Sequence, residues 1–144
     1  MTKPSYYITT PIYYPSDNLH IGHAYCTTIA DSLARFHRLK GEDVFFLTGS
    51  DEHGLKIQRK AKEKGVTPIQ YVDAIIANFK LLWERLNISN NDFIRTSQER
   101  HHKVVQDALQ KIYEQGDIYK KNYKGLYCVP CESYWLERQL DENI

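Results

Sequence analysis

The first 48 residues alternate between strand-like and helix-like patterns, and this alternation constrains the fold more than any other feature of the sequence. A short β-prone run at 6–8 stops at Pro11, and a polar turn over 15–18 follows it. Apolar residues then recur with helical period up to Gly41, which is placed to end a helix. The apolar run at 43–48 is typical of a strand buried on both faces of a parallel sheet. The sequence therefore predicts a right-handed βαβ unit.

Later segments continue this pattern and predict which helix faces are buried. The first helix should turn an apolar stripe toward the core, formed by Cys26, Ile29, Leu33 and Phe36. A basic, solvated helix over 55–64 should be followed by a scaffold helix that starts at Thr67 and Pro68. After a short strand at 93–96, Thr96 and Glu99 predict a capping box for another helix, whose inward residues would be Val105, Ala108, Leu109 and Ile112.

The tetrapeptide His-Ile-Gly-His at 20–23 falls at the start of the first helix, directly after the first strand and its turn. A helix N-terminus presents unpaired N–H groups and a partial positive charge, which suit an anion such as phosphate. His20 and His23 should project from one face, and Gly22 leaves room for a flat ring or a phosphate near the backbone. These residues suit a nucleoside triphosphate as ligand; taken alone, however, a His pair at this spacing is more often a solvated surface pair or a chance metal site.

A second polar segment, 49–54, follows the second strand. Open α/β sheets bind ligands outside the carboxyl ends of their strands, so this segment should lie beside the first helix. Two glycines enclose the ionisable residues, which suits a tight loop that presents side chains to a cleft. Asp51 is the candidate binding residue here; the alternative is that it caps the next helix.

Five segments carry a resemblance to a known family. They are 7–14 (Tyr-Ile-Thr-Thr-Pro-Ile-Tyr-Tyr), 20–25 (His-Ile-Gly-His-Ala-Tyr), 46–54 (Phe-Leu-Thr-Gly-Ser-Asp-Glu-His-Gly), 92–96 (Asp-Phe-Ile-Arg-Thr) and 125–131 (Gly-Leu-Tyr-Cys-Val-Pro-Cys). Together they resemble the methionyl-tRNA synthetases of the compact bacterial type, which are class I aminoacyl-tRNA synthetases. The resemblance covers nearly the whole chain.

The resemblance implies a fold and an activity. The fold would be α/β, with a Rossmann-like parallel sheet and flanking helices at 1–116, followed by the start of a small β-rich connective insertion at 117–144. A shift to Tyr, Lys and Gly after Asp117 agrees with that boundary. The implied activity is a cytoplasmic ligase in protein biosynthesis, which activates methionine with ATP and transfers it to tRNA(Met).

The resemblance also implies roles for individual residues. His20 and His23 would be catalytic and, with Gly22, would bind ATP, which Mg²⁺ would accompany. The methionine site would include Asp51 on the ammonium group, Tyr14 in the side-chain pocket, and the segment of Pro11 and Ile12, where Ile12 offers backbone contacts. A carboxylate opposite an ammonium group and an apolar wall around a thioether are chemically apt.

One family signature is missing from the chain. The Lys-x-Ser-Lys loop that clamps the triphosphate in class I synthetases does not occur in the 144 residues. The interpretation is therefore an N-terminal fragment that is inactive alone. Two alternatives remain open: a small nucleotidyltransferase that shares the His-x-x-His signature, and a non-catalytic binding module derived from a synthetase.

Charge and cysteine content exclude few partners. A net charge of +1 gives no global field that would steer the chain toward nucleic acid, and DNA is not an expected partner. The apolar stretches are too short to cross a bilayer, so no membrane partner is expected. Three cysteines form no disulfide framework and favour a reducing compartment.

Cys128 and Cys131 have the spacing of half a zinc knuckle. No further Cys or His follows them in the chain, so the alternative is a pair of thiols without metal. The resemblance implies that this pair belongs to the connective insertion, whose other zinc ligands would lie beyond Ile144. Zinc is therefore a possible cofactor with an incomplete site in this chain.

Overall fold

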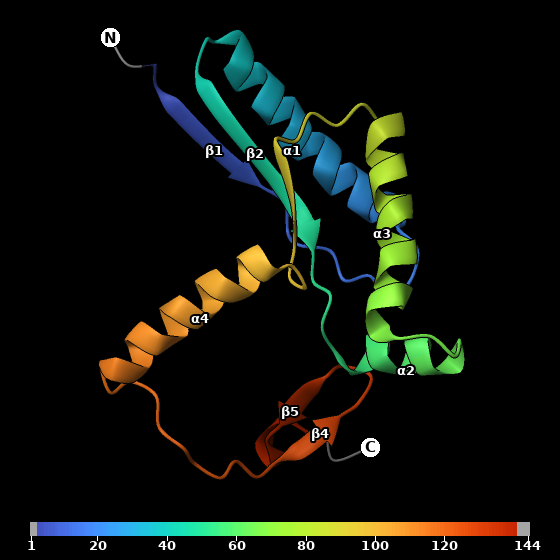
Figure 1. The fold of residues 1–144 in the computed structure, drawn as a ribbon, viewed down its shortest axis with the longest axis vertical. Helices are drawn as coiled ribbons and strands as arrows, with labels where there is room; N and C mark the ends of the chain where they lie inside the picture. Colours follow the sequence, from blue (N-terminus) through green and yellow to red (C-terminus); the bar gives the residue numbers. More distant parts are fainter. Residues whose placement is uncertain (1–2, 141–144) are drawn as a thin grey trace. The chain divides into compact units, whose positions relative to one another are not determined.

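The computed structural model describes residues 3–140, and the chain forms two compact units that divide between residues 103 and 104. The first unit holds a three-stranded parallel sheet in the order β1-β2-β3 (Figure 1). Its elements in chain order are β1 (Ser5–Thr9), α1 (Ile21–Leu39), β2 (Asp43–Ser50), α2 (Leu55–Glu63), α3 (Pro68–Arg85) and β3 (Asp92–Arg95). This is the predicted Rossmann-like α/β arrangement, with strands and helices in the expected places.

The register of the sheet aligns the carboxyl ends of the strands. Tyr6 lies opposite Val44 in the β1–β2 pair, and Ser50 lies opposite Arg95 in the β2–β3 pair. Because all three strands are parallel, the segments that follow β1, β2 and β3 leave the same edge of the sheet. That edge carries both polar segments that the sequence singled out.

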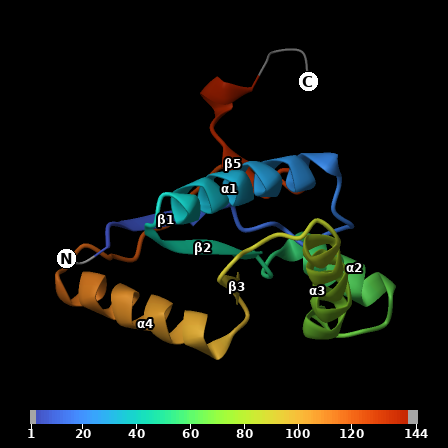
Figure 2. The ribbon, with the colours of Figure 1, turned by 90° about the horizontal axis from the view of Figure 1, so that it is seen from above.

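Helix α1 lies along one face of β1 and β2 (Figure 2), but not on the predicted stripe. Its buried residues are Thr27, Ala30, Asp31 and Ala34, whereas Ile29, Leu33 and Phe36 are 44%, 42% and 55% exposed. Cys26 is half-buried. The prediction was wrong because it followed hydrophobicity alone. A helix that approaches a sheet closely needs small side chains at the contact, and alanines satisfy this where larger residues would not.

Strand β2 is buried less completely than predicted. Val44 and Phe46 pack against Ala30 and Ala34 of α1, and Phe46 is fully buried. Phe45, on the opposite face, remains 46% exposed. The first half of β2 thus alternates between a buried and an exposed face, because α1 covers only one of them.

Helices α2 and α3 form a second core with the segment after β1. Helix α3 starts at a capping box, in which the Thr67 and Gln70 side chains accept each other's backbone N–H, and Pro68 occupies its first turn. The core of this region contains Tyr13, Ile57, Ala61, Tyr71, Val72, Ile75, Ile76, Phe79 and Trp83. The predicted start of α3 at Thr67 and Pro68 is confirmed.

Helix α4 (Glu99–Glu114) departs from its predicted cap and buried face. Thr96 does not cap it, because the Thr96 hydroxyl accepts the backbone N–H of Glu52 at 2.7 Å. No residue of α4 is buried, and Leu109 is 50% exposed. In the described chain, the Thr96 hydroxyl forms a tertiary hydrogen bond instead of a helix cap. The predicted inward residues of α4 are not buried.

The second unit contains an antiparallel hairpin of β4 (Leu126–Cys128) and β5 (Ser133–Trp135), followed by the short 3-10 helix η1 (Glu137–Gln139). The short strands predicted after residue 117 are therefore present. The domain boundary at that residue stays a prediction. Among the described helices, none combines the length and apolar character that crossing a membrane requires.

Candidate active site

His20 and His23 form a reciprocal cap at the start of α1. The Nδ1 atom of His20 accepts the backbone N–H of Gly22 at 3.1 Å, and the Nδ1 atom of His23 accepts the backbone N–H of His20 at 3.1 Å. The two ring centroids are 4.0 Å apart. An Nδ1 atom that accepts a hydrogen bond carries no proton, so the proton of each neutral ring is on Nε2. The cap therefore makes both Nε2 atoms hydrogen-bond donors.

The surroundings of His23 favour its neutral form. Burial lowers the pKa of His23 below its ordinary value of 6.5, and the neighbouring His20 lowers it further. The ring of Tyr13 stands edge-on to the His23 ring, with centroids 4.9 Å apart. His23 thus keeps the tautomer that the cap requires and stays uncharged near neutral pH.

Gly22 is needed for the cap itself. A Cβ at Gly22 would lie 2.9 Å from Cε1 and 3.1 Å from Nδ1 of His20. The sequence predicted that this glycine makes room for a ligand. The structure adds that the space is used by the His20 ring, which could not reach the Gly22 N–H past a larger residue.

Tyr13 joins the helix start to the end of β2, and the sequence analysis did not identify it. Its backbone N–H donates to the Gly49 carbonyl at 3.0 Å, and its carbonyl accepts the Asp51 N–H at 2.9 Å. Its hydroxyl lies 2.7 Å from the Thr27 hydroxyl on α1, and burial raises the pKa of Tyr13. The only signal in the sequence was its position between Ile12 and Tyr14, both candidate ligand residues.

Asp51 follows β2 at the carboxyl edge of the sheet and is half-buried. It does not cap α2, whose N-cap is Gly54 and has no side-chain cap bond, so the alternative role is wrong. Gly54 has a φ of +149° and lies beneath the Tyr14 hydroxyl, which would be 2.1 Å from a Cβ at that position. The Tyr14 side chain therefore reaches the loop after β2, which also contains Asp51.

Pro11 and Ile12 lie between β1 and Tyr13, and both are exposed. Their backbone leads from the last residue of β1 directly to the residue that pairs with Asp51. Ile12 is 42% exposed, so its neighbourhood is open to a ligand. The structure thus collects Pro11, Ile12, Tyr14, His20, His23 and Asp51 around Tyr13 at the carboxyl edge of the sheet.

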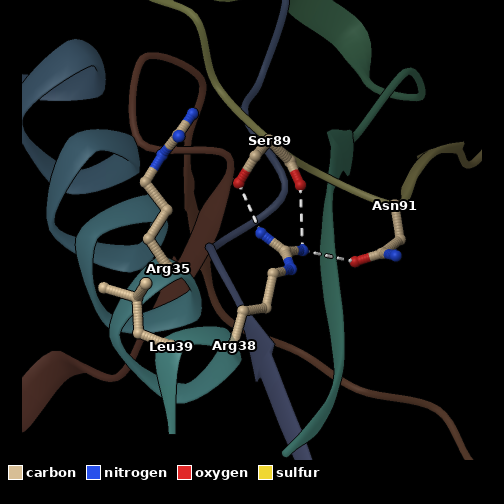
Figure 3. Close-up of a pocket in the computed structure, with 5 residues that line it drawn as sticks. All are labelled: Arg35, Arg38, Leu39, Ser89 and Asn91. Carbon is tan, nitrogen blue, oxygen red and sulfur yellow. Dashed lines mark hydrogen bonds between the residues drawn. The ribbon is translucent and has the colours of Figure 1, made fainter. Parts of the chain in front are cut away.

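A pocket of about 680 Å³ lies elsewhere in the first unit, lined by Arg35, Arg38, Leu39, Ser89 and Asn91 (Figure 3). Arg38 donates to the Ser89 hydroxyl at 2.5 Å and to the Asn91 side-chain oxygen at 2.9 Å. Asn91 also accepts the Phe46 N–H at 2.8 Å. Because these groups hold the loop that precedes β3, this pocket belongs to the amino edge of the sheet and to its architecture.

The described residues do not complete a metal site. Among residues 3–140, no cluster of three or more His, Cys, Asp or Glu side chains could hold an ion. Cys128 ends β4, and Cys131 lies in the turn of the hairpin. Two thiolates supply half of the four ligands of a structural zinc, so a complete knuckle does not fit this part of the chain.

A family model described as class I tRNA synthetases (M) matches residues 6–143. The chain is 61% identical over 140 residues to the methionine–tRNA ligase of Clostridium perfringens, and 60% identical over 138 residues to that of Caldanaerobacter subterraneus subsp. tengcongensis. These alignments cover 97% and 96% of the chain but 22% of each relative. The chain thus spans less than a quarter of the length of these relatives.

A solved structure extends the likeness to three dimensions. The methionyl-tRNA synthetase of Mycobacterium tuberculosis in complex with methionyl-adenylate superposes with a TM-score of 0.89 at 41% identity. The superposition covers 94% of this chain and 26% of that protein. The parallel sheet and its flanking helices are therefore those of a class I synthetase catalytic domain.

Proposed function

This chain belongs to the family of class I tRNA synthetases (M), and on that premise we propose that it is part of a methionine–tRNA ligase. The complete enzyme activates methionine with ATP to methionyl-adenylate and then transfers the methionyl group to tRNA(Met). The chain supplies the first phosphate-binding element and part of the methionine site. The high identity to two methionine–tRNA ligases supports this proposal over a small nucleotidyltransferase or a non-catalytic module.

One structural observation carries the assignment of the site. Tyr13 contacts the His23 ring through its own ring and pairs with Asp51 through its backbone. A pair of histidine donors at a helix N-terminus and a carboxylate at the end of a parallel strand are thereby connected through one residue. The first pair suits the phosphates of ATP, and the carboxylate suits the ammonium group of an amino acid.

The reaction places different demands on these two groups. An oxygen of the methionine carboxylate attacks the α-phosphorus of ATP, the bond to the bridging oxygen breaks, and pyrophosphate leaves. His20 and His23 donate from Nε2 to the phosphate oxygens, where negative charge develops in the transition state. Asp51 binds the ammonium group and so orients the attacking carboxylate. Tyr14, Pro11 and Ile12 line the remainder of the methionine site.

Mg²⁺ enters this proposal as a companion of the nucleotide. Magnesium in nucleotide sites is held largely by phosphates and water. The zinc that the resemblance implies would need ligands beyond Cys128 and Cys131. A cytoplasmic location follows from the proposed substrates, ATP and tRNA.

Two substitutions in the full-length enzyme test the assignment. Asp51→Asn removes the charge that faces the ammonium group, so it should raise the methionine KM by about ten- to a hundredfold and change the ATP KM little. His23→Ala should instead lower the maximal rate of methionine-dependent pyrophosphate exchange by about a hundredfold, with methionine affinity preserved. Steady-state exchange kinetics with each substrate varied provide the measurement.

Asp43→Asn is the matched control, because Asp43 is an exposed aspartate at the amino end of the same strand. It should leave both constants unchanged. Equal losses for methionine and ATP in Asp51→Asn would contradict the role of Asp51. An unchanged exchange rate in His23→Ala would contradict the role of the histidine pair.

A further inference from the structure

Glu52 is a buried acid directly beside Asp51, and the proposed reaction gives it no role. Its side chain is 0% exposed. One carboxylate oxygen accepts the Ser50 hydroxyl at 2.6 Å and the Arg95 Nε at 2.6 Å. The other oxygen accepts the Ser97 hydroxyl. A buried carboxylate costs much free energy unless it is paired and hydrogen-bonded, and Glu52 is both.

The backbone around Glu52 ties the ends of two strands together. The Glu52 N–H donates to the Thr96 hydroxyl at 2.7 Å, and the Thr96 N–H donates to the Ser50 carbonyl at 3.1 Å. Arg95, the last residue of β3, also bonds to Asp73 on α3. Glu52 therefore anchors the loop after β2 to the loop after β3 and, through Arg95, to α3.

Asp51 lies between this anchor and a second one. On its N-terminal side, the Asp51 N–H is fixed by the Tyr13 carbonyl at 2.9 Å. On its other side, the next residue is fixed by the Glu52 contacts. A residue whose backbone is held on both sides has few ways to change the direction of its side chain. The contacts of Glu52 thus restrict the backbone from which the Asp51 side chain extends.

The Glu52–Arg95 pair also keeps the Arg95 guanidinium paired at the end of β3, opposite the last residue of β2. The hydrogen bond with Glu52 raises the pKa of Arg95, and the Asp73 contact adds to it. A guanidinium without its buried partner would attract carboxylates at the same edge of the sheet, where Asp51 follows β2. Such an attraction would compete with the ammonium group of the substrate.

We propose that Glu52 is a positioning residue, whose buried ion pair with Arg95 holds Asp51 in the orientation that binds the ammonium group of methionine. This proposal rests on the proposed function of Asp51. It predicts that Glu52 affects one substrate, methionine, and one group on it, the ammonium. A purely structural acid would affect both substrates alike.

The test is a double-mutant cycle in the full-length enzyme, with Asp51→Asn, Glu52→Gln and the double variant. Binding of L-methionine and of its analogue without the amino group is measured by calorimetry. Glu52→Gln should weaken L-methionine binding about tenfold and leave the analogue unchanged. Because Glu52 acts through Asp51, the double variant should bind L-methionine no more weakly than Asp51→Asn alone.

Asp31→Asn is the matched control for lost stability. Asp31 is also a buried acid that pairs with an arginine, Arg35, at 2.6 Å and accepts the Ser89 hydroxyl at 2.5 Å, but it serves the loop that precedes β3. Asp31→Asn should lower the thermal midpoint about as much as Glu52→Gln does. It should leave the difference in affinity between L-methionine and the analogue unchanged. Ser97→Ala removes a single hydrogen-bond donor to Glu52 and should also weaken L-methionine binding, by less than Glu52→Gln does. This variant keeps the test available if Glu52→Gln does not fold.

The outcomes separate this inference from the proposed function. If Asp51→Asn leaves L-methionine binding unchanged, the role of Asp51 is wrong, and the inference falls with it. Two outcomes overturn the inference alone, provided that Asp51→Asn weakens L-methionine binding. In the first, the losses of L-methionine affinity from Asp51→Asn and Glu52→Gln add in the double variant. In the second, Glu52→Gln weakens binding of the analogue as much as binding of L-methionine. Where Glu52→Gln does not fold, unchanged methionine binding in Ser97→Ala overturns the inference.

Discussion

The Nδ1 atoms of His20 and His23 accept hydrogen bonds from the backbone, and this determines which ring nitrogen can act as a donor. Each Nδ1 accepts a backbone N–H, so each neutral ring carries its proton on Nε2. Under the proposed function, each side chain would thus serve both as a helix cap and as a hydrogen-bond donor to a phosphate oxygen. Loss of the cap by protonation would therefore change stability and chemistry together.

The pH dependence of His23 follows from this geometry. The fold lowers the pKa of His23 below its ordinary value of 6.5, so the unfolded chain binds a proton more readily than the folded one. The stabilisation by neutral His23 is fully present above pH 6.5 and is lost as the pH falls below that value through the folded pKa. The thermal midpoint of the full-length enzyme should exceed that of His23→Asn most above pH 6.5, with a smaller difference at pH 5. A difference that stays constant from pH 5 to 8 would contradict this.

At the scale of the element, α1 separates its apolar face from its contact face. Ala34 is fully buried against β2, whereas its neighbour Leu33 is 42% exposed. Hydrophobicity alone ranks these two positions in the wrong order. Their burial is set by which face of α1 packs on the sheet: Ala34 contacts the cluster of Val44 and Phe46, whereas Leu33 lies outside that cluster.

Hydrophobicity alone would predict that a substitution at Leu33 costs more stability than one at Ala34. The structure predicts the opposite order. Ala34→Leu should overpack the contact with Phe46 and destabilise the protein by about 1–3 kcal/mol. Leu33→Ala should cost about 0.5 kcal/mol or less, because this position is at the surface of the described chain. Thermal unfolding of both variants in the full-length enzyme measures the difference. A larger loss for Leu33→Ala would show that this face is buried in the complete protein.

At the scale of the whole molecule, the chain contains one of the two sequence signatures that the family resemblance implies, the His-Ile-Gly-His segment at 20–23. It covers 22% of the methionine–tRNA ligases it matches, and the Lys-x-Ser-Lys loop does not occur in its 144 residues. Among the described strands, β1 pairs on one side only. An unpaired edge of this kind exposes backbone groups that another strand would satisfy.

We therefore expect the 144-residue chain alone to give no methionine-dependent pyrophosphate exchange above background. Both the Lys-x-Ser-Lys loop and the remaining strands of the sheet would be needed to hold ATP in position for attack by the methionine carboxylate. The measurement uses purified chain with methionine and ATP at saturating concentrations, and the full-length enzyme serves as the positive control. Formation of methionyl-adenylate by the chain alone would overturn this expectation.

The sequence by itself determined the order of elements in the first unit and the two segments that make up the candidate site. The β-prone run, the helical period after it and the apolar run at 43–48 gave β1, α1 and β2, because these signals are local. The tetrapeptide at 20–23 and the segment at 49–54 were recognisable for the same reason. Parallel strands then bring both to one edge, whatever the details of packing.

Only the tertiary structure decided which residues connect these parts. Tyr13 reads locally as one aromatic residue among several, yet its two backbone bonds and its ring join the helix start to the end of β2. Thr96 reads as a helix cap, but its hydroxyl accepts the N–H of Glu52, 44 positions away. The burial of Ala34 in place of Leu33 likewise depends on which face of α1 packs on the sheet. Contacts between residues distant in sequence have no local pattern, so propensity and periodicity cannot reveal them.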